Sequence, residues 1–466
     1  MEGLTSWARG FLGGIWSANF KHSGKRADID RAIRIATNAA QQVSDPKRRA
    51  AQLSDAAKYL VERYFAFGDV ADLDTAVTHG AFALELTRSH SDRWMYLWMY
   101  LNDLALWLGH RHEARGDRAD LEQALRLLDE ALGAMPPGMD RAKLHLNRTT
   151  WLAARHRLTG DRADLDAAVI AASDALVLAP TGSDRAAYLD TLAQRLAERH
   201  DALGDGQDID EAVRLTTDAA NLAAGTSDWG RLLGNLALHL GTRYEATSAL
   251  PDLEAAITHG AEAVRLTPAG PNRATFLENH SNRLVDRFRA LGDPADLDDA
   301  IAALEEALTF APAGPARVRT LNDLANQLSE RHDLRGDRGD LDRSVLAAEE
   351  AVSAGATGPL GATLLNGLAG RLGERSAVTG DGEDLERAIA LARAALDMSP
   401  DGPTRGYYLT RLATLLKQRI DLVGDPSAAD LDEAIDLERE ALRLVHSGHR
   451  VAFVAQHNLA LSLFRR

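Results

Sequence analysis

Small and large apolar residues alternate with polar residues along the whole chain at the spacing of an α-helix. In the clearest copy, residues 160–180, apolar residues stand 1, 4, 5, 8, 11 and 12 positions after Asp164. These offsets lie on one face of a helix with 3.6 residues per turn. The pattern predicts an amphipathic helix that begins at this aspartate, whose carboxylate accepts the free amide hydrogens of the first turn.

The aspartate recurs at a nearly constant interval. Followed by Leu or Ile, it stands at Asp28, Asp72, Asp120, Asp164, Asp208, Asp252, Asp296, Asp340, Asp384 and Asp430, and we call it the anchor aspartate. Seven of the nine intervals are 44 residues, and the other two are 48 and 46. Self-similarity of this kind is typical of stacked repeats. We therefore expect ten copies of one unit in a single elongated domain, residues 1–466.

A second helix is predicted before each anchor aspartate. In its clearest copy, residues 192–200, Ala193 stands three positions before Leu196, and the helix ends at Gly204. A large residue beside a small one lets two helices approach closely, and glycine supplies the left-handed backbone that closes a helix. Each repeat is therefore expected to be a pair of helices.

These residues resemble the tetratricopeptide repeat: Leu-Ala, then Leu, then Leu-Gly-Asp, then Ala, then Ala-Leu and Pro. The repeat is longer than the usual 34 residues, by about ten. Arrays of this length are similar to those of kinesin light chains, and to those that precede caspase-like CHAT protease or nucleotide-binding modules in signalling proteins. The resemblance implies an all-α fold, a right-handed α-solenoid of ten helix pairs plus a C-terminal capping helix, residues 450–466.

The composition excludes some classes of functional site and disfavours some classes of partner. The net charge is −15, from 53 basic and 68 acidic residues, which disfavours nucleic acid as a partner. The chain has no cysteine, so disulfides, thiolate metal sites and cysteine nucleophiles are excluded. No apolar run is long enough to span a membrane, and the N-terminus does not resemble a signal peptide. We expect a cytoplasmic protein that binds no membrane, although residues 4–20 have an apolar face that would also suit an anchor.

Aromatic residues concentrate where the interval lengthens to 48 residues. We predict that five aromatic residues of this region contact a partner: Trp94, Tyr96, Trp98, Tyr100 and Trp107. Tryptophan and tyrosine suit recognition because they bring a large contact area at a small entropic cost. The alternative is that these residues only pack one helix pair.

Asparagines recur just before the Leu-Ala signature. In related arrays the first helix of each repeat lines a concave groove, where asparagine bonds the backbone of an extended peptide. By resemblance, the peptide-binding candidates are Asn102, Asn147, Asn235, Asn279, Asn322, Asn366 and Asn458. An amide both donates and accepts hydrogen bonds, so it can bind peptide groups of any sequence. The alternative is that the amides cap or bridge neighbouring helices.

An arginine near the end of the first predicted helix recurs in nine repeats, as Arg199 does in the clearest copy. We interpret it as structural, because the Gly-Asp turn and the anchor aspartate offer carboxylates. The next position holds His, aromatic residues, Ser or Ile, which indicates packing rather than metal binding. No constellation supports catalysis, a metal site or a cofactor.

We therefore expect a non-catalytic scaffold that binds an extended peptide or partner segment, neutral or basic in character, in its concave groove. A first alternative is a regulatory or sensor module of a signalling or defence-type system that controls a CHAT-protease or nucleotide-binding effector. A more remote alternative is a small-molecule binder or enzyme that uses the aromatic region between Trp94 and Trp107.

Overall fold

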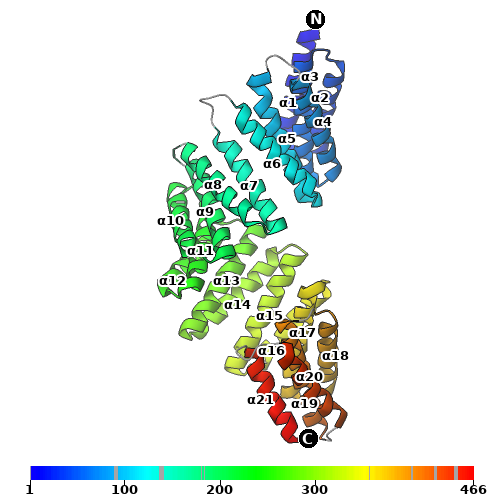
Figure 1. Cartoon of the computed structure of the whole chain (residues 1–466), viewed down its shortest axis with the longest axis vertical. Coiled ribbons are helices and arrows are strands. Elements are labelled where there is room, and N and C mark those ends of the chain that lie inside the picture. The colour runs from blue at the N-terminus through cyan, green and yellow to red at the C-terminus, as the bar shows by residue number, and fades with distance from the viewer. Residues whose placement is uncertain are drawn as a thin grey trace. The chain divides into compact units, whose positions relative to one another are not determined.

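The computed structural model describes residues 2–88, 93–135, 141–179, 181–182, 184–355, 357–399, 402–424, 428–444 and 450–465. Throughout these ranges the regular structure is helical, and the helices form consecutive pairs (Figure 1). The all-α solenoid of paired helices expected from the repeats is confirmed. None of the helices in these ranges combines the length and the hydropathy needed to cross a bilayer.

The first helices of the ten pairs are α1 (Glu2–Ser23), α3 (Pro46–Phe67), α5 (Arg93–Arg115), α7 (Ala142–Thr159), α9 (Asp184–Leu203), α11 (Trp229–Thr247), α13 (Pro271–Leu291), α15 (Pro315–Arg335), α17 (Gly358–Thr379) and α19 (Pro403–Val423). The second helices are α2 (Arg26–Gln42), α4 (Val70–Arg88), α6 (Arg118–Ala134), α8 (Arg162–Leu178), α10 (Gly206–Leu222), α12 (Leu250–Leu266), α14 (Pro294–Phe310), α16 (Arg338–Ser353), α18 (Gly382–Asp397) and α20 (Ala428–Leu444). A final helix, α21 (Arg450–Arg465), packs against α20 and α19.

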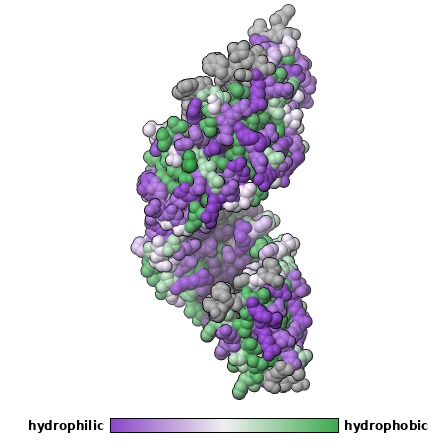
Figure 2. All heavy atoms as spheres, in the orientation of Figure 1, coloured by the Kyte–Doolittle hydropathy of each residue, from purple (hydrophilic) through white to green (hydrophobic). Residues whose placement is uncertain are grey.

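The chain divides into two compact units, residues 1–226 and 227–466. The expectation of one continuous domain stays a prediction. In the first unit α5 contacts α7 and α7 contacts α9; in the second, α11 contacts α13 and α17 contacts α19. Successive first helices therefore form one face within each unit. On the surface that Figure 2 displays, hydrophilic residues predominate, with apolar residues in small patches between them.

The core of each unit follows the repeat. In the first unit it includes the recurrent leucine of the first helix, Leu108, and the leucine after the anchor aspartate, Leu121. In the second unit the equivalent residues Leu328, Leu372 and Leu385 lie in one buried cluster. Small residues such as Ala168 are fully buried, so neighbouring helices can approach closely.

The helix cap differs from the prediction. The helix α8 begins two residues earlier than expected, at Arg162, and its N-cap is Asp161, whose carboxylate accepts a hydrogen bond from the Ala163 amide at 3.0 Å. The cap therefore belongs to the Gly-Asp turn and not to the anchor aspartate, Asp164. A carboxylate at the N-cap reaches the free amides that one in the first turn cannot.

The anchor aspartate instead holds the recurrent arginine of the preceding helix. In the clearest copy Arg199 donates from Nε and Nη2 to the two carboxylate oxygens of Asp208, at 2.7 and 2.6 Å. The same bidentate pair occurs as Arg63–Asp72, Arg111–Asp120, Arg155–Asp164, Arg243–Asp252, Arg287–Asp296, Arg331–Asp340, Arg375–Asp384 and Arg419–Asp430. We call it the clasp. It confirms that the arginines are structural.

The clasp also joins neighbouring repeats. The Nη1 group of Arg287 donates to Glu254 on the second helix of the preceding pair at 3.0 Å, and that of Arg331 donates to Asp298 at 2.8 Å. Hydrogen bonds to the anchor aspartates, Asp296 and Asp340, and then to these carboxylates raise the pKa of both guanidinium groups above its ordinary value. One arginine therefore fixes the turn inside its own repeat and the position of that repeat on the one before it.

Histidines beside the clasp have a structural contact as well. In α9 the Nδ1 of His200 donates to the backbone carbonyl of Asp205 at 2.8 Å, and His112, His156 and His332 make the same bond in their repeats. The bond joins the end of the first helix to the cap of the second. This agrees with the interpretation of the position as a packing position.

Candidate functional site

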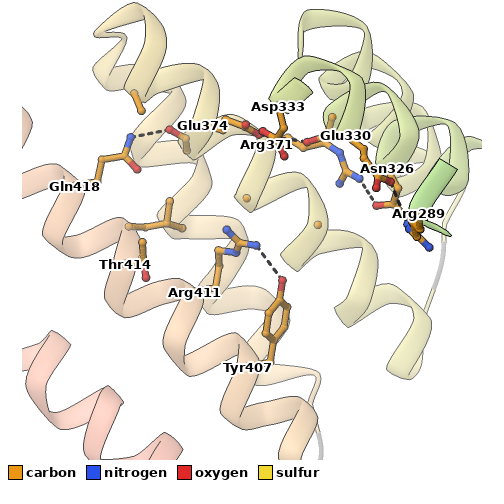
Figure 3. A pocket seen from close by; sticks show the side chains of 16 residues that line it. Arg289, Asn326, Glu330, Asp333, Arg371, Glu374, Tyr407, Arg411, Thr414 and Gln418 are labelled. Carbon is orange, nitrogen blue, oxygen red and sulfur yellow. Dashed lines mark hydrogen bonds and ion pairs between the residues drawn. The ribbon is translucent and has the colours of Figure 1, made fainter. Parts of the chain in front are cut away.

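A cavity of about 670 Å³ lies on the face formed by the first helices of the second unit. Its lining comes from α13, α15, α17 and α19, so it crosses four successive repeats (Figure 3). The polar and charged side chains around it are Arg289, Asn326, Ser329, Glu330, Asp333, Arg371, Glu374, Tyr407, Arg411, Thr414 and Gln418. The face is therefore hollow and strongly polar at this point.

Three glycines of α17 help to form the cavity. Gly367, Gly370 and Gly373 are three residues apart, so they share one face of the helix, where glycine costs about 1 kcal/mol relative to alanine. A Cβ atom at Gly373 would lie 2.4 Å from the Cδ2 atom of Leu415, and one at Gly370 would lie 3.0 Å from Cζ of Arg411. The missing side chains allow α19 to approach α17 closely.

Arg371 extends from α17 towards α15 and is buried, with 6% of its surface exposed. Its Nε donates to the Ser344 hydroxyl at 2.8 Å, and its Nη2 donates to the Asn326 side-chain oxygen at 2.5 Å. Both acceptors are neutral. Burial, and then the charge of Arg411, lower the pKa of this guanidinium to about 10. The Arg371 guanidinium therefore lies in an environment that disfavours its positive charge.

Arg411 reaches the cavity from α19. Its Nη2 donates to the Tyr407 hydroxyl at 3.0 Å, and its guanidinium lies 5.7 Å from the centre of the Tyr407 ring (Figure 3). Its Nε is buried and has no hydrogen-bond partner. This arginine also has neutral neighbours in place of a carboxylate.

Carboxylates occupy another part of the cavity. The pKa of Glu374 is raised, first by burial and then by hydrogen bonding and charge from Asp333. The Ser329 hydroxyl donates to Glu374 at 3.3 Å, and Arg289 donates to Glu330 at 3.1 Å. Glu330 is thus paired with Arg289, whereas Arg371 and Arg411 are bonded to neutral oxygens.

The predicted aromatic residues do not form one exposed patch. The side chain of Trp94 lies outside the described residues. Trp107 is 5% exposed and packs so closely on Gly80 that a Cβ atom there would lie 2.4 Å from the indole. Trp107 is therefore a core residue, because the missing side chain at Gly80 on α4 leaves room for its ring.

Three other aromatic candidates are half-buried on α5. Tyr96 lies under the Lys47 ammonium group, which is 4.9 Å from the ring centre, and the Trp98 indole nitrogen is buried without a hydrogen-bond partner. Burial, then the charges of Asp55 and Asp103, raise the pKa of Tyr100 to about 12. Their assignment to a partner stays a prediction.

A row of rings across three first helices was missed in the sequence. Phe65 on α3 meets His110 on α5 with ring centres 5.0 Å apart, and His110 meets Trp151 on α7 at 5.9 Å, both edge-on. Phe65 is exposed and Trp151 is buried. The row runs diagonally across the repeats, so comparing equivalent positions of each copy did not reveal it.

The candidate asparagines are placed unevenly. The Asn147 amide donates to the Asn102 side-chain oxygen at 2.8 Å, which brings these two together across α5 and α7. Asn235, Asn279, Asn322 and Asn458 are half-buried on their first helices. Asn366 is 3% exposed, and its side-chain oxygen has no hydrogen-bond partner. Asn366 therefore does not present its amide on the surface as the other candidates do.

Comparison with known proteins concerns the fold alone. The helix pairs stack at the interval of the repeat, as the helix pairs of tetratricopeptide arrays do. No protein-family model and no curated protein matches this chain.

Among solved structures, the array is similar to the human IFIT1 dimer with PPP-AAAA, at 14% identity and a TM-score of 0.45, over 93% of this chain and 90% of that chain. It is similar to yeast Tom70 at 17% identity and a TM-score of 0.38, over 100% and 97% of the two chains. A tetratricopeptide repeat protein from Parabacteroides merdae has 15% identity and a TM-score of 0.37, over 68% of this chain and 98% of that one. These likenesses carry no information about a ligand of this chain.

Proposed function

We propose that the tetratricopeptide-like array is a non-catalytic scaffold that binds an extended segment of a partner protein along its first helices. The observation that carries the proposal is the cavity over α13, α15, α17 and α19, which is lined by polar and charged groups and includes the buried Arg411 Nε, an atom without a hydrogen-bond partner. A buried polar group without a partner costs free energy, so a ligand that supplies the partner gains affinity there. A peptide in extended conformation offers donors and acceptors along its whole length.

Asparagines on the same face have the chemistry to hold a peptide backbone. In this proposal Asn102 and Asn147 act in the first unit, and Asn235, Asn279 and Asn322 act in the second, with Asn458 on α21. Each amide can donate to a peptide carbonyl and accept from a peptide amide, whatever the peptide side chains. Specificity then depends on the charged and aromatic residues between them.

The test selects binders from a displayed library of random peptides on the full chain and measures their affinities by fluorescence anisotropy. The double variant Asn235→Ala/Asn279→Ala is expected to lose about tenfold in affinity, because it removes two neutral hydrogen bonds. The matched control is Asn38→Ala/Asn221→Ala, which alters exposed asparagines of second helices. Circular dichroism verifies that both variants are folded.

One result would refute the role of the asparagines, and another would refute a protein partner. If the Asn235→Ala/Asn279→Ala variant binds as tightly as the control variant, the asparagines do not hold the peptide. If no peptide is selected but a 5′-phosphorylated oligoadenylate RNA binds, the partner is nucleic acid and the proposal of a protein partner is wrong.

A further inference from the structure

Three first helices carry an arginine at the same position, immediately before the recurrent leucine. Arg195 forms an ion pair with Glu198 at 3.1 Å. Arg283 forms ion pairs with Glu245 at 2.7 Å and Asp286 at 3.3 Å. For the third, Arg371, no carboxylate of the described chain lies within ion-pair distance. Equivalent arginines are therefore neutralised inside the protein at two repeats and left without a counter-ion at the third.

The contacts of Arg371 leave part of its guanidinium unused. Its Nε and Nη2 are engaged by the neutral oxygens of Ser344 and Asn326, and its Nη1 lies against Gly367, 2.9 Å from the place of a Cβ atom. The nearest acidic residue along its own helix, Glu374, interacts with it only through the longer-range charge. A buried cation without an anion is costly, so an anion from outside would be stabilised here.

Arg411 supplies a second guanidinium beside the first. It lies against Gly370, one turn along the same glycine face of α17. Because side chains three residues apart on a helix start about 5–6 Å from each other, the Arg371 Nη1 and Arg411 Cζ atoms lie within roughly 12 Å of each other. The burial of the Arg411 Nε without a partner shows that the protein itself does not satisfy this group.

We infer that Arg371 and Arg411 together bind one acidic group of the partner segment, a carboxylate or a phosphoryl group, against the glycine face of α17. This inference rests on the proposed function, because it names the chemistry of the segment that the groove takes. Guanidinium groups bind carboxylates and phosphoryl groups through paired, charge-assisted hydrogen bonds. Because Gly367 and Gly370 have no side chains, both guanidinium groups can lie against α17, 2.9 and 3.0 Å from the places of the missing Cβ atoms, and line the same cavity.

The rest of the cavity limits the sequence of the segment. Glu330, Asp333 and Glu374 lie in the same cavity and repel further acidic groups. The segment is therefore one with an acidic residue next to basic or neutral residues, and not an acidic run. This local preference differs from the neutral or basic partner expected from the net charge of −15, because that charge is an average over the whole chain.

The test uses peptides selected on the full chain and synthesised with their acidic residue as Glu, phosphoserine or Gln. The Gln peptide is expected to bind wild type about 10- to 100-fold more weakly, which is the range for loss of a charge-assisted hydrogen bond. The preference between Glu and phosphoserine distinguishes the two sources of the acidic group. The variants Arg371→Gln and Arg411→Gln are expected to bind Glu, phosphoserine and Gln peptides with nearly equal affinity.

The matched control is Arg283→Gln, which alters the equivalent arginine of α13 where carboxylates already neutralise the charge. This variant is expected to keep the preference for the acidic peptide. If the Gln peptide binds wild type as tightly as the Glu peptide, or if Arg371→Gln and Arg283→Gln behave alike, the inference is overturned while the scaffold proposal stands.

A second measurement does not depend on any peptide. Inorganic phosphate at constant ionic strength is expected to raise the melting temperature of wild type and of Arg283→Gln, and not that of Arg371→Gln or Arg411→Gln. If phosphate stabilises the site but the library yields no peptide, the scaffold proposal fails and the anion site remains. An equal rise in all four proteins means that phosphate acts on the surface generally, and the inference is then wrong.

Discussion

The clasp in the α15–α16 pair offers a quantitative test of what holds the repeats together. Arg331 donates to both oxygens of Asp340, at 2.7 and 2.6 Å, and to Asp298 at 2.8 Å. The side chains of Arg331 and Asp340 are 15% and 5% exposed. Replacing Arg331 with Met leaves the buried Asp340 carboxylate without its bidentate partner, and only Arg343, at 3.7 Å, remains as a neighbouring cation.

The expected loss follows from this burial. Removing one partner of a buried ion pair costs about 3–5 kcal/mol, and the lower end applies because Arg331 keeps some exposure to water. A loss of about 3 kcal/mol lowers the melting temperature by roughly 6–10 °C in a cooperative unit of this size. The change is measured by urea and thermal unfolding followed by circular dichroism. Hydrogen exchange then locates the destabilised repeats, because helical arrays can unfold in parts.

The control variant is Arg335→Met, one turn further along the same helix. Arg335 also bonds Asp298, at 2.7 Å, but its side chain is 39% exposed. An exposed ion pair contributes about 1 kcal/mol or less, so this variant is expected to be nearly as stable as wild type. If the two variants lose the same stability, burial does not determine the strength of the clasp and the argument is refuted.

Three further predictions concern single positions. Ser248 ends α11 with a left-handed φ of 58°, so Ser248→Gly is expected to stabilise the protein by about 0.5–1 kcal/mol in urea unfolding; no gain would contradict this. The pKa of Glu374 is raised above 4.5, so the stability it contributes is complete below about pH 4.5 and is lost as the pH rises through its folded value. The variant Asp333→Asn should lose less stability as the pH rises, which urea unfolding at several pH values measures. An unchanged dependence of the free energy of unfolding on pH would contradict this prediction. Gly370→Leu should lower the free energy of unfolding by about 1–3 kcal/mol, because a guanidinium group fills the space beside Gly370. Gly133→Ala should raise it by up to about 1 kcal/mol, because no atom lies within 4 Å of the new Cβ. Equal effects would show that the contact at Gly370 does not matter.

Much of the fold was predictable because packing repeats along the chain. The recurrence of the anchor aspartate and of the buried leucine marks every helix pair, and the pairs are present as expected. The cap was assigned to Asp164 instead of Asp161, because both carboxylates stand near the start of the helix and the sequence alone does not show which one Arg155 binds. Propensity identifies a helix start more reliably than its capping residue.

The candidate site was less predictable, because it depends on neighbours from different repeats. The sequence places Arg195, Arg283 and Arg371 at equivalent positions, but it does not reveal that carboxylates reach only the first two. Likewise Trp107 resembles a surface aromatic in the sequence and is buried in the structure, since Gly80 on the neighbouring helix admits its ring.

By itself the sequence determined the class of the protein: helix pairs, their number, their length and the structural role of the recurrent arginines. It could do so because each repeat packs on the next through the same few residues. Only the tertiary structure decided which charges remain unpaired, since an ion pair depends on distances of a few ångströms, and the carboxylates that pair with Arg195 and Arg283 stand 3 or 38 residues away along the chain. The pairing of Arg283 and the isolation of Arg371 are decided at that scale.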